Sequence, residues 1–321
     1  MLSFTLRRLG QSIVLVLIMS VLVFFCMYIV SDPVAVLASD DFTEEDRIAL
    51  ASELGVDRPI LVQYFQFTSN ILHGDFGTSF VYNKPVLPLI LERLPATLEV
   101  AILALTIGLC AGVPMGIYSG LNHRKKITKA ISFITTIGYS IPNFWQALLL
   151  IIVFAVWLKI LPASGRGDTT FLFGIGWSFF NLDGLRHMLL PAVNLAIYKI
   201  CMQTRLARSG TQEVMFQDYI TFARAKGLPR QRIIRRHLLR NILIPIVTIT
   251  GLELGGLIAF STVTETVFSW PGIGKLLIDS IHHADRPVVV AYLILITLMF
   301  VIINFIVDMA YAVLDPRIRH T

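Results

Sequence analysis

The stretch EVMFQDYITFARAKGLPRQRIIRRHLLRNILIP, residues 213–245, is the longest strongly polar and basic segment of an otherwise mostly apolar chain. Asp218 is suited to the N-cap of a short helix over residues 219–226, and Gly227 would end that helix in a left-handed conformation. A second helix is expected to begin at Pro229, whose missing N–H costs nothing in a first turn. One face of the short helix is mostly apolar and carries Tyr219, Phe222, Ala223 and Lys226.

An apolar face in a basic loop needs a surface to bury against, and the residues alone leave two alternatives. The loop could lie on its own membrane domain or on anionic lipid headgroups. It could instead dock into a groove on a separate protein.

The remainder of the chain is that of a membrane protein. Of its 321 residues, 55% are hydrophobic and 15% are charged, and the mean hydropathy is +0.72. A membrane-spanning helix needs ~20 mostly apolar residues. Four runs approach or exceed that length, and two weaker runs are interrupted by Lys199 and Glu253. The six predicted spans are 9–30, 100–118, 130–158, 188–204, 242–264 and 288–307.

The placement of the charges indicates how these spans are oriented. With a cytoplasmic N-terminus, 17 of the 27 lysines and arginines fall in cytoplasmic segments, nine fall in outer segments, and Lys199 lies within a span. This bias follows the positive-inside rule, so the net charge of +6 does not require nucleic-acid binding. The first apolar run is longer than a signal-peptide core, which favours an uncleaved anchor over the cleavage site that residues 36–38 resemble. Both termini are therefore expected in the cytoplasm.

Interruptions in two spans provide candidates for a transport pathway. Residues 140–145 break the third span, and broken helices often line transport routes, although a structural kink explains the proline equally well. Glu253 lies midway along the fifth span and should avoid lipid, on the side opposite to the small-xxx-small pair Gly251 and Gly255. It is expected either to line a cavity or to bond a polar group of a partner chain. The pathway candidates are Ser140, Pro142, Asn143, Glu253 and Gly255.

Other kinds of chemistry find little support in the sequence. The three cysteines all lie in apolar spans as small hydrophobic side chains, and the seven histidines show no metal-ligand spacing, so neither a metal site nor a catalytic residue is predicted. Hydrolase and metalloprotease motifs are missing from the sequence, and Gly274-Lys275 lacks the spacing of a phosphate-binding loop. An ion-driven secondary transporter would need several intramembrane carboxylates, but only Glu99, Glu253 and Asp308 qualify.

Several motifs together resemble one family. The most specific motif lies in the basic loop and comprises Asp218-Tyr219, residues 223–228, His237, residues 239–241 and Pro245. Further motifs extend over the chain at residues 54–59, 74–79, 95–99, 264–274 and 315–319. They resemble the dipeptide/oligopeptide/nickel permease subunits of ATP-binding-cassette (ABC) importers, and among these the dipeptide permease B-type subunits. Thr221-Phe222-Ala223 replaces the Glu-Ala-Ala of the wider importer class, as is normal for the peptide/nickel branch.

The resemblance implies a fold and a location. The fold would be an all-α polytopic membrane protein with six transmembrane helices in the type I ABC importer permease architecture. An N-terminal anchor and first transmembrane helix would occupy residues 1–30, and an extracytoplasmic cap residues 31–94. The core permease domain would occupy residues 95–321, with a coupling loop at about 205–243. The protein would lie in the bacterial inner membrane.

The resemblance also implies a function and partners. The chain would form half of a translocation pathway for di- or oligopeptides, or alternatively for nickel or a metal chelate, and would itself be non-catalytic and bind no cofactor. It would pair with a second homologous permease chain, with two ABC ATPases that bind ATP and magnesium, and with an extracytoplasmic solute-binding protein. The residues expected to couple it to the ATPases are Asp218, Tyr219, Phe222, Ala223, Arg224, Ala225, Lys226 and Gly227.

Overall fold

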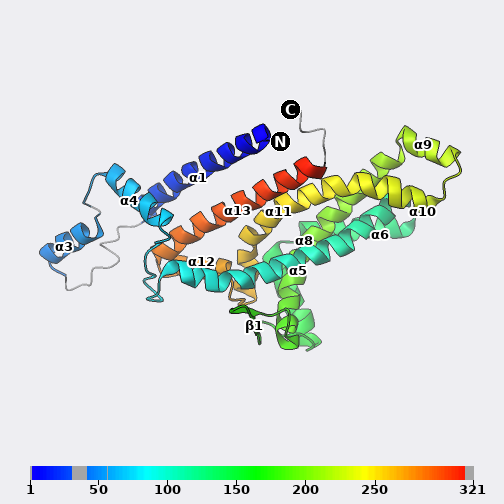
Figure 1. Cartoon of the computed structure of the whole chain (residues 1–321). Coiled ribbons are helices and arrows are strands. Elements are labelled where there is room, and N and C mark those ends of the chain that lie inside the picture. Colours follow the sequence, from blue (N-terminus) through cyan, green and yellow to red (C-terminus); the bar gives the residue numbers. More distant parts are fainter. Residues whose placement is uncertain (1, 31–41, 56, 315–321) are drawn as a thin grey trace. The chain divides into compact units, whose positions relative to one another are not determined.

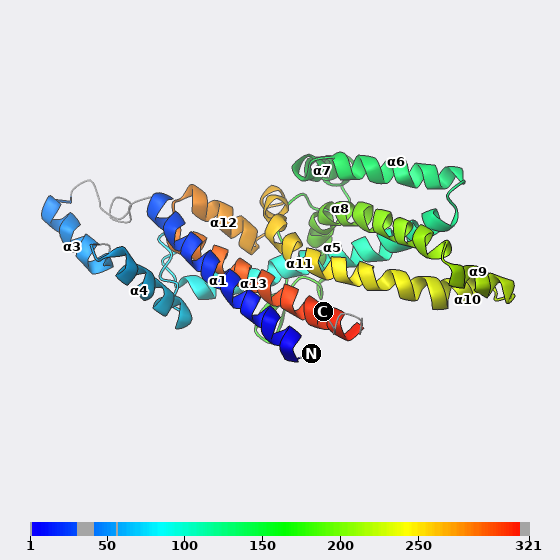
Figure 2. The same ribbon diagram turned by 90° about the horizontal axis from the view of Figure 1, so that it is seen from above.

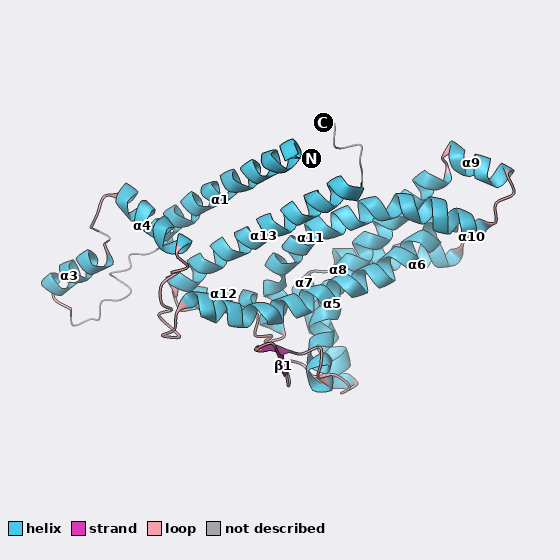
Figure 3. Cartoon of the chain, in the orientation of Figure 1, coloured by secondary structure: helices cyan, strands magenta, loops and turns pink. Residues whose placement is uncertain are grey.

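A computed structural model describes residues 2–30, 42–55 and 57–314 of the chain. The signal-like residues 36–38 and the motif at 315–319 lie outside the described residues. Within the described residues the fold is all-helical, as predicted, apart from one short β-hairpin (Figure 3).

The chain divides into two compact units, and each is described by itself. The first unit comprises Leu94–Lys275 and Ile303–Thr321, and the second comprises Leu2–Arg93 and Leu276–Ile302. Three helices contribute residues to both units: α5 (Val86–Leu121), α12 (Ile273–His282) and α13 (Arg286–Leu314).

The second unit contains α1 (Leu2–Val30), α3 (Glu44–Leu54) and α4 (Ile60–Leu72). Tyr64 of α4 joins α4 to α1. Its ring packs edge-on against Phe24, with 5.4 Å between the ring centroids, and its hydroxyl shares a 2.8 Å hydrogen bond with Ser20.

Helix α3 begins and ends where its sequence signals predict. The Thr43 hydroxyl donates to the Asp46 carboxylate at 2.7 Å, the Thr43 backbone N–H donates to it at 3.0 Å, and the Asp46 N–H donates back to Thr43 at 3.2 Å. These bonds form a capping box. Because the hydroxyl and then the backbone N–H stabilise the charged carboxylate, they lower the pKa of Asp46 from its ordinary 3.8. Gly55 ends the helix with a left-handed φ of +68°.

The first unit is built around the long helix α8. Its elements are α6 (Lys126–Ser140), α7 (Asn143–Leu150), the π-helix η1 (Ile151–Trp157), α8 (Leu182–Met215), α9 (Asp218–Ala225), α10 (Arg230–Arg232), the π-helix η2 (Ile233–Leu238) and α11 (Leu239–Val267). Helix α8 packs along both α6 and α11 (Figure 2).

Helices α5 and α8 approach each other closely because α5 presents a glycine at every fourth position. A Cβ added at any of these glycines would collide with α8. The Thr204 hydroxyl also donates to the Gly112 carbonyl at 3.2 Å, a direct bond between the two helices. Small residues therefore permit the close packing, as expected of a membrane helix pair. The glycines Gly108, Gly112, Gly116 and Gly120 face Lys199, Gln203, Ala207 and Thr211 respectively.

The loop between η1 and α8 contains the β-hairpin, which the sequence analysis did not predict. Strand β1 (Thr170–Leu172) pairs antiparallel with β2 (Ile175–Trp177). The two turn residues, Phe173 and Gly174, both have positive φ, at +54° and +78°. Two consecutive positive φ values are typical of the type I′ turn that joins tightly twisted strands.

The structure confirms long apolar helices but does not establish six spans. Four described helices are long and apolar enough to cross a membrane, within α1, α5, α10–α11 and α13. The pair α6 and α7–η1 would be a fifth, but it is bent by 108°. Pro142 stands at this break in an extended conformation, outside either helix, so the third predicted span is broken more sharply than by a proline kink. Helix α8 has the length but is too polar to qualify, so the six-span count stays a prediction.

Candidate functional site

The short helix α9 lies in the loop that follows α8, at one end of α8 and α11 (Figure 1). It begins one residue earlier than predicted, because Gln217 and not Asp218 occupies the N-cap position. Asp218 stands in the first turn, where its negative charge favours the helix N-terminus. Gly227 follows the helix with a φ of +73°, the left-handed conformation that the sequence predicts.

One side of α9 is buried within the chain, and it is not the side that carries Phe222. Ile220 and Ala223 are buried against Ile233 of η2 and against Leu228. Phe222 lies two residues from Ile220, about 200° around the helix, and points to the opposite side. Phe222 therefore stays available to a surface outside this chain, as either alternative for the apolar face requires. The sequence analysis did not predict that Ile220 is buried, because its partner in η2 lies further along the chain.

Large aromatic residues are exposed on α9 and just before it. Phe216, Tyr219 and Phe222, here called the α9 aromatic surface, are 84%, 42% and 61% exposed. The Tyr219 hydroxyl accepts a 3.0 Å hydrogen bond from Asn241, and the Lys226 ammonium lies 4.5 Å from the Phe222 ring centroid. Among the predicted coupling residues Ala223 is buried, while the exposed ones are Asp218, Tyr219, Phe222, Arg224, Ala225, Lys226 and Gly227.

Polar side chains tie α8 to α11 at three levels. Asn143 of α7 joins the level formed by Asn194 and Thr264, because its side-chain amide donates to Thr264 at 3.2 Å. The Asn194 amide group also donates to the Asn143 side-chain carbonyl. The three α8–α11 contacts, each of 3.0 Å, are Asn194 to Thr264, Lys199 to Glu253 and Gln203 to Thr250.

A cavity of about 590 Å³ lies among α6, α7, α8 and α11, all within the first unit. Part of its wall is apolar and includes Leu257 and Phe260 of α11. The rings of Tyr139 and Tyr198, on another part of the wall, stack with 5.1 Å between their centroids. The polar lining residues are Tyr139, Asn143, Gln146, Asn194, Tyr198, Lys199 and Glu253.

Glu253 has a partner within its own chain. Its carboxylate oxygen Oε2 lies 3.0 Å from Lys199 Nζ, with the two side chains 15% and 8% exposed. No hydrogen bond of good geometry reaches this oxygen from the residues that the structure describes. Gly251, two positions earlier, lies against Val307 of α13. Glu253 therefore points away from the glycine contact and toward the cavity.

The other pathway candidates do not line this cavity among the described residues. Ser140 is exposed, and its hydroxyl donates to the Thr136 carbonyl at 2.9 Å. Pro142 is exposed at the break between α6 and α7, and Gly255 is buried next to the cavity-lining Gly256. The structure thus brings together only Asn143 and Glu253 of the five candidates.

Sequence reasoning predicted only Asn143 and Glu253 of this cavity, and Lys199 and Asn194 are among the polar residues that it missed. A signal for Lys199 was present, because it interrupts the fourth predicted span just as Glu253 interrupts the fifth. Opposite charges inside two neighbouring membrane helices are expected to pair. Asn194 carried no such signal, since a single amide in a weakly apolar span has no preferred partner.

A second polar cluster is fully buried where α11 ends. Glu265 accepts hydrogen bonds from the Thr97 hydroxyl at 2.7 Å, the Ser261 hydroxyl at 2.8 Å and the Lys275 backbone N–H at 3.0 Å. The Trp270 indole N–H donates to the backbone carbonyl before Thr97, at 2.8 Å. The family-like segments 95–99 and 264–274 therefore meet in space and form a structural joint.

The neighbouring carboxylate of Glu99 is held by the loop that precedes α8. Arg166 donates to Glu99 at 3.0 Å, to the Ser178 hydroxyl at 3.0 Å and to the Gly176 carbonyl at 2.7 Å. The Ser178 N–H also donates to Glu99, whose side chain is fully buried. This loop, in which the sequence analysis found no chemistry, is thus fastened to α5 by a buried ion pair.

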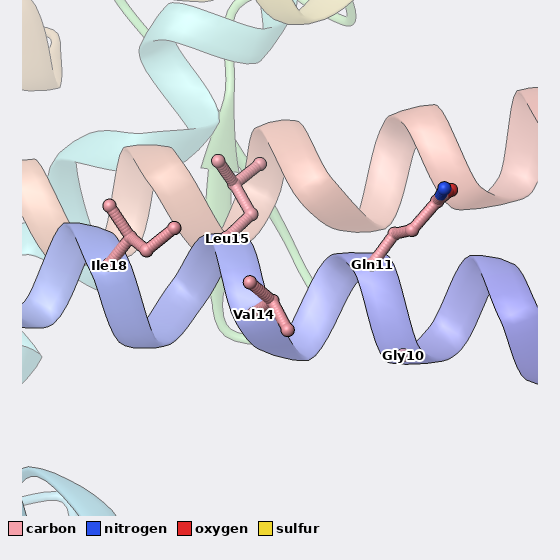
Figure 4. A pocket seen from close by; sticks show the side chains of 5 residues that line it. All are labelled: Gly10, Gln11, Val14, Leu15 and Ile18. Atoms are coloured by element: carbon pink, nitrogen blue, oxygen red, sulfur yellow. The ribbon is translucent and has the colours of Figure 1, made fainter.

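A separate hollow of about 420 Å³ runs along α1 in the second unit (Figure 4). It forms where Gly10 leaves room beside Val14, Leu15 and Ile18, and only Gln11 brings a polar group to it. The exposed aliphatic side chains are those expected of a helix that faces lipid tails. No functional site is assigned to it.

The chain is similar to known proteins along its whole length. Residues 112–320 match the family described as binding-protein-dependent transport system inner membrane component, and residues 1–101 match the corresponding N-terminal family. The chain is 37% identical to the dipeptide transport system permease protein DppB of Escherichia coli K12, over 100% of this chain and 99% of that protein. It is also 37% identical to the oligopeptide transport system permease protein AppB of Bacillus subtilis 168, over 100% of both.

Among solved structures, the fold is similar to an inward-facing conformation of the MetNI methionine ABC transporter. The TM-score is 0.58 at 18% identity, over 72% of this chain and 98% of that chain. The similarity supports the type I ABC importer permease architecture. The chain therefore belongs to the family of binding-protein-dependent transport system inner membrane components, on the branch that includes the dipeptide and oligopeptide permeases.

Proposed function

We propose that this chain is a permease subunit of an ABC importer and forms half of a translocation pathway for di- or oligopeptides. Family membership supports the importer assignment. The observation in this chain that best supports coupling to a separate ATPase is the exposed α9 aromatic surface. Large aromatic side chains on a helix, flanked by the exposed Arg224 and Lys226, are typical of a surface that docks into a groove on a partner.

The chain itself is non-catalytic, and its family works with ATPase and substrate-binding partners. A second homologous permease chain would supply the other half of the pathway. In the proposed cycle, ATP binding closes the ATPases and moves the groove that holds α9. Helices α8 and α11 flank the α9 loop and would carry this motion into the membrane.

The protein is placed in the bacterial inner membrane by its family. We place both termini and the α9 loop in the cytoplasm, since most of the lysines and arginines lie in the segments that this orientation puts there. Asn83 and Gln231 are both exposed and fall on opposite sides in this arrangement. An impermeant thiol reagent that reached Asn83→Cys and Gln231→Cys from the same side would contradict it.

Peptides are favoured over nickel as the cargo because relatives along the whole chain are named for dipeptide and oligopeptide transport. An ion-driven mechanism is less well supported. Of the carboxylates that it would use, Glu99 is held by Arg166 and Glu253 is paired with Lys199. These two are thus already engaged and do not form an open proton route.

Substitution of Gly227 tests whether the end of α9 matters for coupling. An added Cβ there meets nothing within 4 Å, so Gly227→Val introduces backbone strain without a collision inside this chain. A β-branched residue at positive φ costs on the order of 1 kcal/mol or more, whereas asparagine tolerates this conformation. ATP-dependent peptide uptake by the reconstituted importer should fall several-fold in Gly227→Val and stay close to wild type in Gly227→Asn.

Cross-linking tests the docking surface directly. A cysteine at Phe222 should cross-link to an ATPase subunit, while a cysteine at the buried Ala223 is the matched control and should not. Phe222→Ser and Arg224→Glu should reduce uptake by weakening that contact. Wild-type uptake in both variants, together with wild-type uptake in Gly227→Val, would contradict the proposed coupling role.

A further inference from the structure

The cavity of the first unit contains two opposite charges at the middle of two long helices. Lys199 is near the centre of α8 and Glu253 near the centre of α11. An isolated charge at the centre of a membrane helix costs about 2.5–3.5 kcal/mol on insertion scales. Ionisable groups in this position usually mark a functional site, and pairing reduces but does not remove their cost.

The polar groups around this cavity are not all satisfied. Asn194 is 1% exposed, yet its side-chain carbonyl oxygen accepts no hydrogen bond from the described residues. The Glu253 oxygen nearest Lys199 likewise lacks a hydrogen bond of good geometry. A buried acceptor left open costs free energy, and a ligand that donates to it recovers that cost. Among the described residues, the site therefore offers one open acceptor, on Asn194, close to an ion pair whose geometry leaves room for exchange with a ligand.

The size and lining of the cavity fit a small ligand with both charges. Its volume of about 590 Å³ is within the roughly 300–1,000 Å³ typical of small-molecule sites. Apolar walls at Leu257 and Phe260 would accommodate side chains of varied shape, because apolar contacts are not directional. The open Asn194 acceptor suits an amide N–H, the glutamate suits an ammonium group, and the lysine suits a carboxylate.

We infer that this cavity is a transient site for the backbone of a short peptide, in which Glu253 accepts the peptide's ammonium group and Lys199 binds its carboxylate. In the empty state the two side chains pair with each other, so a peptide must displace that pair. This competition keeps binding weak enough for release, as a transport pathway requires. The inference rests on the proposed peptide-importer function and specifies which residues of this chain contact the cargo.

The test uses the complete importer in proteoliposomes, with a photoreactive benzoyl-phenylalanine in place of Phe260 and radiolabelled alanyl-phenylalanine as the probe. Phe260 lines the cavity and is 78% exposed, so it should capture the peptide during ATP-driven turnover. The same group at Phe133 of α6, which is 67% exposed but outside the described cavity wall, is the control and should not.

Glu253→Gln should reduce both capture at Phe260 and the kcat of uptake by about tenfold or more, as expected when a charge-assisted hydrogen bond is lost. Affinity of the solute-binding protein for the peptide and assembly of the complex should not change. Glu92→Gln removes the same charge from an exposed position and should behave as wild type.

The outcomes separate the inference from the function on which it rests. If the wild-type importer shows no ATP-dependent peptide uptake, the proposed function fails and the inference fails with it. If uptake is normal but Phe260 captures no peptide, or if Glu253→Gln transports as well as wild type, the inference is wrong and the importer function stands. If Glu253→Gln loses assembly as well as uptake, the Lys199–Glu253 pair is structural and the inference is also wrong.

Discussion

Two carboxylates on the same helix, Glu253 and Glu265, lie twelve residues apart and have opposite surroundings. Glu265 is fully buried and accepts three hydrogen bonds from α5, α11 and the start of α12. Glu253 lines a cavity, has one ionic partner and keeps an oxygen without a hydrogen bond. A saturated carboxylate fixes neighbouring segments in place, whereas an unsaturated one is available to a ligand. The number of donors, more than burial, thus separates the structural charge from the one that we propose to be functional.

The largest effect is expected for Glu265→Ala, which would remove the acceptor of the Thr97 hydroxyl and the Lys275 N–H, while the Ser261 hydroxyl would keep the Ile258 carbonyl at 2.8 Å. Each unsatisfied buried group costs about 1–3 kcal/mol, so the complex should assemble poorly and melt at a lower temperature. Glu265→Gln keeps one accepting oxygen, so its melting temperature should lie between those of Glu265→Ala and wild type. Thermal unfolding of the purified complex measures this. A melting temperature of Glu265→Ala equal to that of wild type would remove the distinction between the two carboxylates.

Glu99 sharpens the comparison because it is as buried as Glu265, but its negative charge is stabilised mainly by one cation, Arg166. Arg166→Met would leave this carboxylate with the Ser178 N–H alone and should destabilise the complex by about 3 kcal/mol. Replacing the charge as well, with Glu99→Gln in the Arg166→Met background, should recover part of the loss, since a neutral amide is less costly to bury. The four melting curves of this double-mutant cycle provide the measurement, and a double variant less stable than Arg166→Met would contradict the buried-charge explanation.

The smallest effect is expected at Asp46, which is exposed to solvent, unlike Glu265 and Glu99. Thr43 lowers its pKa, so its charge stabilises α3 at pH above the ordinary value of 3.8, and that stabilisation is lost as the pH falls through the lowered pKa. Amide exchange in α3 should be slightly faster in Asp46→Asn than in wild type at pH 7, and the difference should vanish in acid. Glu45→Gln, in the same turn but outside the capping box, is the control. A difference that persisted at pH 2 would show that the charge is not responsible.

The sequence predicted the elements that depend on local chemistry. The left-handed Gly227 after α9 and the break before Asn143 both follow from a few neighbouring residues, and both are confirmed. The family motif likewise predicts a coupling loop at about residues 205–243, the region that contains α9.

Features that depend on long-range partners could not be predicted. The burial of Ile220 depends on Ile233, thirteen residues further on, which packs on its side of α9. Arg166 reaches Glu99 across 67 positions of the chain, and a lone arginine in a loop gives no sign of such a partner. The fourth predicted span stays untested for a related reason, since α8 contains polar residues such as Asn194, Lys199 and Gln203, whose partners lie on α11.

The glycine contacts between α5 and α8 have a mechanical consequence. The glycines of α5 have no side chains, so each sits directly against a different residue of α8. The residues of α8 that protrude between the glycines prevent the two helices from sliding past each other. This stretch of α5 and α8 must then turn together, as a stiff segment that measures about 18 Å between Lys199 and Thr211 at 1.5 Å per residue. Bending must take place elsewhere, and residues 141–142, where no helix continues from α6 to α7, provide a hinge of two residues.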